Sequence, residues 1–205
     1  MTQFPGEVSD YIAASLQAVE RHPKHALRPI LRRNLYVLLS TTAPASSKVL
    51  GWLDILTAEY ALPILRTERP TDATPDRLLK IARGVVQGKR SREAAQKSAD
   101  NSWEWLNSAY YRKNQSISDS AACAYAALIF SVFSAAGNDA FMRVDIQETD
   151  EDIDIDFESC DVAAVVAQAI TGGLRPPGPD SATRLEYWTW WLTQAIPAAG
   201  EQAYA

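Results

Sequence analysis

The chain has 205 residues, 47% of them apolar and 22% charged, a composition typical of a globular protein and a length that fits one sizeable domain. Its net charge of -5 comes from the segment 145–161, which holds nine carboxylates and no Lys or Arg and leaves 20 bases against 16 acids elsewhere. An acidic strip on a mildly basic body argues against broad nucleic-acid binding, because the strip repels phosphate.

Helical signals follow one another along the chain and are separated by short breaks. A cap, Pro and acid in sequence at Thr74, Pro75 and Asp76 predict a helix start, and Gly88 predicts its end. The helices expected on such grounds cover about 9–22, 29–39, 46–62, 75–87, 91–112, 119–136, 160–171 and 182–196. The sequence therefore predicts a single all-α domain, residues 1–205, of roughly eight helices with an extended acidic segment inserted near 145–158.

Three local expectations follow from the same patterns. Arg32 and Arg33 fall on the polar side of the second helix, Ser159 can cap the seventh, and Pro197 follows the end of the last.

The most apolar stretch, 121–136, includes two serines and is short for a membrane span, which favours a buried helix. The N-terminus lacks the basic start and apolar run of a signal peptide. Cys123 and Cys160 give no disulfide framework, and Cys123 lies in an Ala-rich helix where a reduced core thiol is expected. We expect a cytoplasmic protein without membrane, metal or cofactor; the sequence leaves its oligomeric state open.

The centre of the acidic segment alternates strictly between acids and the apolar residues Ile153, Ile155 and Phe157. This period of two places the acids on one side of an extended segment and the apolar side chains on the other. The segment is thus expected to dock on the core, as Ile146 also suggests, and to present a charged face to a basic protein partner. The carboxylates expected to bind that partner are Asp150, Glu151, Asp152, Asp154, Asp156 and Glu158.

Other interpretations of these carboxylates stay open. The spacing is similar to that of a calcium loop, although no Gly supplies the sharp turn and apolar residues interleave. The acids could instead perform acid–base catalysis, form a solvated loop, or serve a scaffold that binds another basic protein. His22 and His25 are expected to be solvated residues at a helix junction, since no matched ligands accompany them.

The tail from Arg184 to Pro197, R-L-E-Y-W-T-W-W-L-T-Q-A-I-P, is expected to pack in the core on both faces. It resembles the end of an all-α family of bacterial immunity proteins from polymorphic-toxin systems, and the Ala-rich helix before Gly137 fits that family's style. The resemblance implies a protein that binds a cognate toxin in the producing cell and blocks it without catalysis. The sequence carries none of the hydrolase, metalloprotease or phosphate-loop motifs, as suits an inhibitor without catalysis. If the toxin is a nuclease, its basic active site would complement the charge of the acidic segment.

Overall fold

The computed structural model describes residues 4–42, 46–111, 117–138, 141–143, 145–148, 150–151, 159–172 and 181–205. Within those ranges the chain is all-α and contains no strand. The elements are α1 (Gly6–Arg21), α2 (Pro29–Thr42), α3 (Ser46–Tyr60), α4 (Leu62–Glu68), α5 (Thr74–Val86), α6 (Arg92–Tyr111), α7 (Asp119–Ala135), the 3₁₀ turn η1 (Phe141–Arg143), α8 (Val162–Ile170), α9 (Ser181–Trp190), the π-helical η4 (Trp191–Ala195) and α10 (Ile196–Tyr204). The predicted fold class is confirmed.

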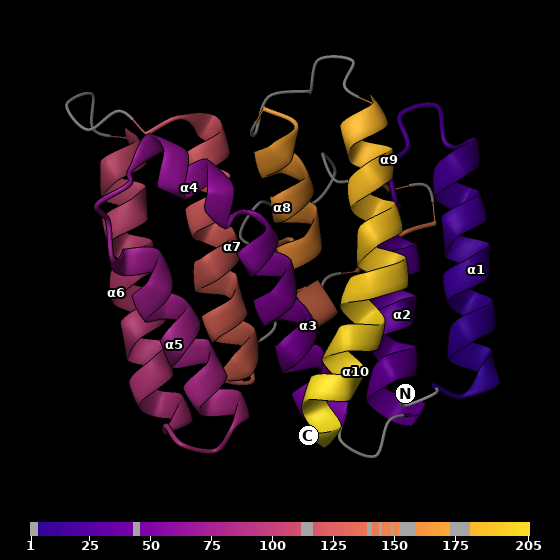
Figure 1. Cartoon of the computed structure of the whole chain (residues 1–205), viewed down its shortest axis with the longest axis horizontal. Helices are drawn as coiled ribbons and strands as arrows, with labels where there is room; N and C mark the ends of the chain where they lie inside the picture. The colour runs from indigo at the N-terminus through magenta and orange to yellow at the C-terminus, as the bar shows by residue number, and fades with distance from the viewer. Residues whose placement is uncertain are drawn as a thin grey trace.

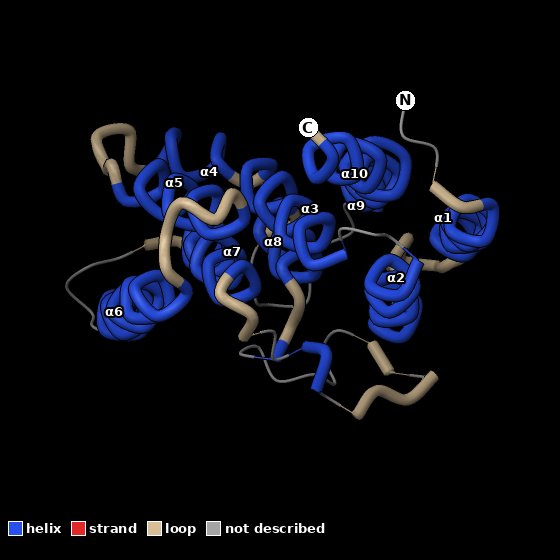
Figure 2. The backbone as a smooth tube through the Cα atoms, turned by 90° about the horizontal axis from the view of Figure 1, so that it is seen from below, coloured by secondary structure: helices blue, strands red, loops and turns tan. Residues whose placement is uncertain are grey.

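The helices lie side by side with their axes roughly aligned (Figure 1). Helices α4 to α7 occupy one end of the long axis, α1, α2, α9 and α10 occupy the other, and α3 and α8 lie between them (Figures 1 and 2). Helix α7 packs against α3, α4, α5, α6 and α8, while α3 also contacts α2 and α10. The buried apolar residues of the two ends therefore join into one core through α3, α7 and α8.

Helix α7 is the most buried element because its sequence is apolar on all sides. Every residue in the range 121–132 is buried, including Tyr125 and Ser131. Five of these residues are alanines, whose small side chains let neighbouring helices approach closely. No helix in the described part of the chain is both long and apolar enough to cross a membrane.

Several helix ends lie where the local sequence predicts them. Helix α5 begins at Thr74, and Ser118 caps α7 by accepting a hydrogen bond from the N–H of Ala121 at 3.1 Å. After α5, Gly88 adopts φ +70°, and the N–H of Lys89 donates to the carbonyl of Gly84 at 2.8 Å. The left-handed conformation of Gly88, which favours glycine, lets the N–H of Lys89 bond one of the last carbonyls of the helix.

The Trp-rich tail packs in the core, as expected. Trp188 and Trp191 are 1% and 0% exposed and meet edge to face, with ring centroids 5.8 Å apart. The indole N–H of Trp191 donates to the hydroxyl of Thr57 in α3 at 3.0 Å. The tail is therefore a structural element that joins the C-terminus to α3.

The expected helix end before Pro197 is wrong. The helix passes from α9 through η4 into α10 without a break, and Pro197 lies in the first turn of α10. A proline in an α-helix lacks the N–H and clashes with the carbonyl four residues earlier. The wider π-helical turn, in which the N–H of Ile196 donates to the carbonyl of Trp191, lies where that clash would occur and accommodates the ring.

Candidate functional site

The acidic segment is described at its two ends. Of the six carboxylates expected to bind a partner, Asp150 and Glu151 are described, while Asp152, Asp154, Asp156 and Glu158 lie outside the described residues. The described pieces run along one broad face of the molecule (Figure 2). Ile146 is 5% exposed and belongs to the core, which agrees with the expectation that the segment docks through its apolar side chains.

Asp150 closes a turn within the segment itself. Its carboxylate accepts a hydrogen bond from the N–H of Gln147 at 2.7 Å, and its own N–H donates to the carbonyl of Gln147 at 3.1 Å. A short Asp side chain that bonds a nearby backbone N–H stabilises a turn of this kind. Asp150 therefore shapes the start of the acidic run.

Glu151 attaches the segment to the junction between α1 and α2. Its Oε1 lies 3.1 Å from Nε2 of His22 and 3.6 Å from Nε of Arg28. Nδ1 of His22 accepts hydrogen bonds from the N–H groups of Lys24 and Ala26, both at 3.2 Å, so Nε2 carries the proton that is donated to Glu151.

The expectation that His22 is solvated is wrong. Its side chain is only 11% exposed, and its ring links the loop after α1 to the acidic segment. Arg28 adds a second link, because its Nη1 donates to the carbonyl of Glu148 at 3.5 Å. Three separate interactions therefore hold the entry to the acidic run against the same short loop.

The other end of the segment carries a buried ion pair. Nε of Arg32 donates to Oδ2 of Asp161 at 2.7 Å, and the two side chains are 0% and 2% exposed. The same guanidinium donates to the carbonyl of Leu27 and lies over the ring of Trp188, 5.4 Å from its centroid. Oδ1 of Asp161 also accepts from the N–H of Ala164 at 2.8 Å and caps α8.

Two expectations about this region are therefore wrong. Arg32 does not lie on a polar helix side, and Asp161, not Ser159, caps α8. A buried guanidinium is tolerated only when its charge is paired and its N–H groups have acceptors, and Asp161 and Leu27 supply both. Sequence periodicity cannot detect this arrangement, because Arg32 and Asp161 are 129 positions apart.

The two ends thus return to one place in the fold. Glu151 is held beside Arg28 and Asp161 beside Arg32, and these two arginines are separated by one helical turn at the start of α2. A recess of about 480 Å³ lies next to this junction, between α1 and α2, and includes His22 and Arg28. In the sequence nine residues, 152–160, separate these two attachments.

Metal binding was one open interpretation of this segment. Within the described ranges no three His, Cys, Asp or Glu side chains gather into a group that could hold an ion. The run on which a calcium loop depends, 152–158, lies outside those ranges. The core thiol expected at Cys123 is confirmed as free and buried, and burial followed by the nearby charge of Asp119 raises its pKa to about 12.

Comparison with known families identifies the protein class. Residues 12–198 match the family described as immunity protein Imm5. The chain belongs to the Imm5 family of immunity proteins. The match contains α2 to α9 entirely, including both arginines at the junction and the Trp-rich tail, whose resemblance to immunity proteins it confirms. No curated protein matches the chain at a significant level.

Membership in this family supports a role as an immunity protein and implies a toxin partner in general terms. It also places the anchored acidic segment inside the region that defines the family, because 145–161 lies within 12–198.

Proposed function

We propose that this protein binds a cognate bacterial toxin in the cytoplasm of the cell that makes both, and neutralises it stoichiometrically without catalysis. The observation that carries the proposal is the Imm5 match over residues 12–198. An inhibitor of this kind acts by covering a surface of its target, so its requirements are shape, charge and a rigid framework.

The acidic segment is the proposed docking surface. The attachments of Glu151 and Asp161 support it, because a charged loop held at both ends loses less conformational entropy on binding than a free one. Asp150, Glu151, Asp152, Asp154, Asp156 and Glu158 remain the proposed contact residues, with Asp150 and Glu151 also holding the loop in shape. A row of like charges accelerates encounter with a basic partner. A nuclease domain, whose active site binds phosphate, has the complementary charge.

The test uses the toxin encoded beside this gene and measures association by stopped flow at several salt concentrations. The variant Asp152→Asn/Asp154→Asn/Asp156→Asn/Glu158→Gln removes four charges without touching the anchors. We expect association at low salt to slow by about tenfold or more, with a flatter dependence on salt. The matched control Asp10→Asn/Glu93→Gln/Glu104→Gln/Glu201→Gln removes four charges from exposed positions elsewhere and should stay close to wild type.

Two outcomes would contradict the proposal at different levels. Equal rates for the variant and its control would remove the acidic segment from the interface while leaving the inhibitor role intact. Failure of the wild-type protein to bind the toxin or to protect cells that express it would remove the inhibitor role itself. Calorimetry with Ca²⁺ and Mg²⁺ tests the remaining alternative, since saturable heat at micromolar ion concentrations would indicate a divalent-cation site.

A further inference from the structure

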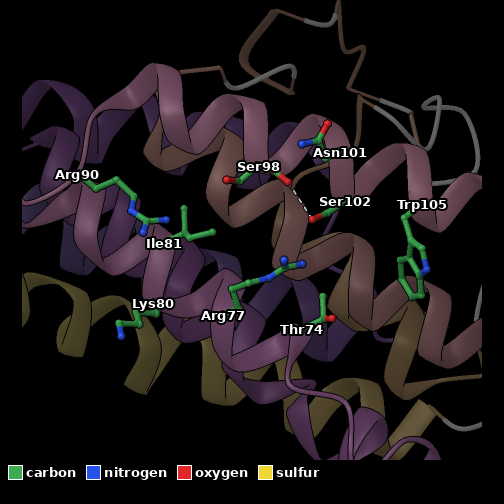
Figure 3. A pocket seen from close by; sticks show the side chains of 9 residues that line it. All are labelled: Thr74, Arg77, Lys80, Ile81, Arg90, Ser98, Asn101, Ser102 and Trp105. Atoms are coloured by element: carbon green, nitrogen blue, oxygen red, sulfur yellow. Dashed lines mark hydrogen bonds between the residues drawn. The ribbon is translucent and has the colours of Figure 1, made fainter.

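A polar groove separates α5 from α6 at the end of the molecule that is farther from α1 and α2 (Figure 1). Its volume is about 570 Å³. Helix α6 contributes Ser98, Asn101 and Ser102, and α5 with the following turn contributes the cations Arg77, Lys80 and Arg90. The side chains of Arg77 and Arg90 extend over the space between the two helices, whereas Lys80 points away from α6 (Figure 3).

The groove exists because the wall formed by α6 carries mostly short side chains. Positions 98, 101, 102 and 105 share one face of α6, so the face directed at α5 carries serines and an asparagine where a packed helix pair would carry larger apolar residues. These short side chains leave a recess that the long cations reach across.

Among the described residues, the cations of the groove differ from their neighbours in making no ion pair. Nearby, Arg66 pairs with Asp76, Arg69 with Asp72 and Arg83 with Glu59. Among the described residues, no carboxylate lines the groove, and the side chains of Arg77, Lys80 and Arg90 make no ion pair or hydrogen bond. Lys80 and Arg90 also line a second recess on the other side of α5, so the positive charge continues toward α4.

The hydroxyls of the groove are already used as donors. Ser98 donates to the carbonyl of Ala94 at 3.0 Å, and Ser102 donates to the carbonyl of Ser98 at 2.8 Å (Figure 3). The groups left to bind an anion in the groove are therefore the two guanidiniums and the amide of Asn101, since Lys80 points away from α6. Planar guanidiniums suit carboxylate or phosphate oxygens, which they can bind through two parallel hydrogen bonds.

We propose that this groove is a second contact surface for the toxin and receives carboxylate side chains from an acidic helix of it, an inference that rests on the proposed function. Gly84, against which Arg90 packs, lies seven positions after Arg77 in α5, so the two arginines start about 10 Å apart along the groove. Acidic residues seven positions apart on a helix have the same spacing.

A protein partner fits this groove better than a nucleic acid does. Binding of single strands relies on aromatic faces on which bases stack. The aromatic ring of the groove, Trp105, already has the guanidinium of Arg69 over it at 5.9 Å and the ring of Tyr125 against it at 5.2 Å. The nine carboxylates of 145–161 would also repel a polyphosphate chain, whereas a folded toxin can present charge of each sign to each surface.

The test compares Arg77→Gln/Arg90→Gln with the control Lys48→Gln/Lys97→Gln, which removes the same charge from exposed positions outside the groove. Binding to the toxin encoded beside the gene is measured by calorimetry and by stopped flow. We expect the groove variant to bind about tenfold more weakly than wild type and with a reduced salt dependence. The control should remain within about twofold.

The outcomes separate this inference from the proposed function. If wild type binds the toxin and the groove variant binds as tightly as the control, the groove is not a contact and the inference fails alone. If wild type does not bind the toxin, both fail. A fluorescent 20-nucleotide single strand is titrated at the same ionic strength. Binding by wild type that the groove variant loses would reassign the groove to a phosphate backbone and overturn the inference.

Discussion

The junction between α1 and α2 and the groove between α5 and α6 both gather cationic side chains, but the two regions use them differently. At the junction His22, Arg28 and Arg32 each meet a carboxylate of the acidic segment, and the pair made by Arg32 is buried. In the groove Arg77 and Arg90 are exposed, and among the described residues no carboxylate lines the groove.

This contrast separates charges that hold the fold from charges that remain available to a partner. A paired and buried charge contributes to stability only through its partner, and its loss leaves the other charge uncompensated. An exposed, unpaired charge contributes little to stability and keeps its full capacity to steer or bind another molecule. The two regions should therefore respond in opposite ways to neutralising substitutions.

The largest expected effect is at the junction. Arg32→Ala should lower the free energy of unfolding by about 3–5 kcal/mol, because it leaves the carboxylate of Asp161 buried without its counter-ion. Urea unfolding followed by circular dichroism measures this loss, and Lys48→Ala at an exposed position should change stability by less than about 0.5 kcal/mol.

A second variant sharpens the interpretation of that loss. Arg32→Met/Asp161→Ser removes both charges, keeps much of the volume and retains a hydroxyl that can cap α8. This double variant should recover more than half of the stability lost in Arg32→Ala. Equal loss in the two proteins would mean that packing against Trp188, and not the uncompensated charge, dominates.

An intermediate effect is expected at Asp72, near the start of α5, which is partly buried and paired. Burial raises the pKa of its carboxyl, but the hydrogen bonds from Tyr125 and Thr74 and the charge of Arg69 together lower it by more. The pKa of Asp72 therefore lies below its usual value. A carboxyl whose pKa is lower in the folded state than in the unfolded state stabilises the fold at pH values above its unfolded-state pKa. This stabilisation is lost as the pH falls through the folded-state pKa.

Asp72→Asn should therefore lower the free energy of unfolding at pH 7 by about 1–2 kcal/mol, and its difference from wild type should shrink as pH is lowered below about 4. Urea titrations between pH 3 and pH 7 measure this. Asp100→Asn, at an exposed position, serves as the control. If the difference in the free energy of unfolding between Asp72→Asn and wild type does not change with pH, the charge of Asp72 is not its cause.

The smallest expected effect is in the groove. Arg77→Gln/Arg90→Gln should keep the free energy of unfolding within about 0.5 kcal/mol of wild type, because neither side chain has a partner to lose among the described residues. Thermal and urea unfolding test this expectation. A loss above about 1 kcal/mol would show that these arginines support the fold, and the contrast between the two regions would no longer hold.

Local features of the fold could be predicted from the sequence because their causes are local. The start of α5 at Thr74 and the stop at Gly88 each depend on residues within one turn of the helix end. The burial of the Trp-rich tail was predictable for a similar reason, since aromatic residues cover more than one face of that helix.

Features that depend on distant partners could not be predicted in this way. The burial of Arg32 and the attachment of His22 both require carboxylates 129 positions away. The groove could not be predicted from the sequence, because Ser98, Asn101 and Ser102 have the pattern of an ordinary solvated helix face. Only the position of α5 makes that face the wall of a recess. The expected contact role of the acidic segment remains a prediction.

The π-helical turn η4 makes the tail sensitive to the number of its residues as well as to their identity. Each residue added to or removed from a helix rotates everything beyond it by about 100°. Upstream of the turn Trp188 faces the core, and downstream Ile196, Ala199 and Ala203 face it too. A π-helical turn holds one residue more than the α-helix would need, so deleting Thr193, an exposed residue of the turn, would restore regular α-helical winding and leave these last three residues facing the core. The cost of that deletion would fall on Pro197, whose ring would then clash with the carbonyl four residues earlier, whereas one residue inserted after the turn would rotate the residues that follow it by about 100°.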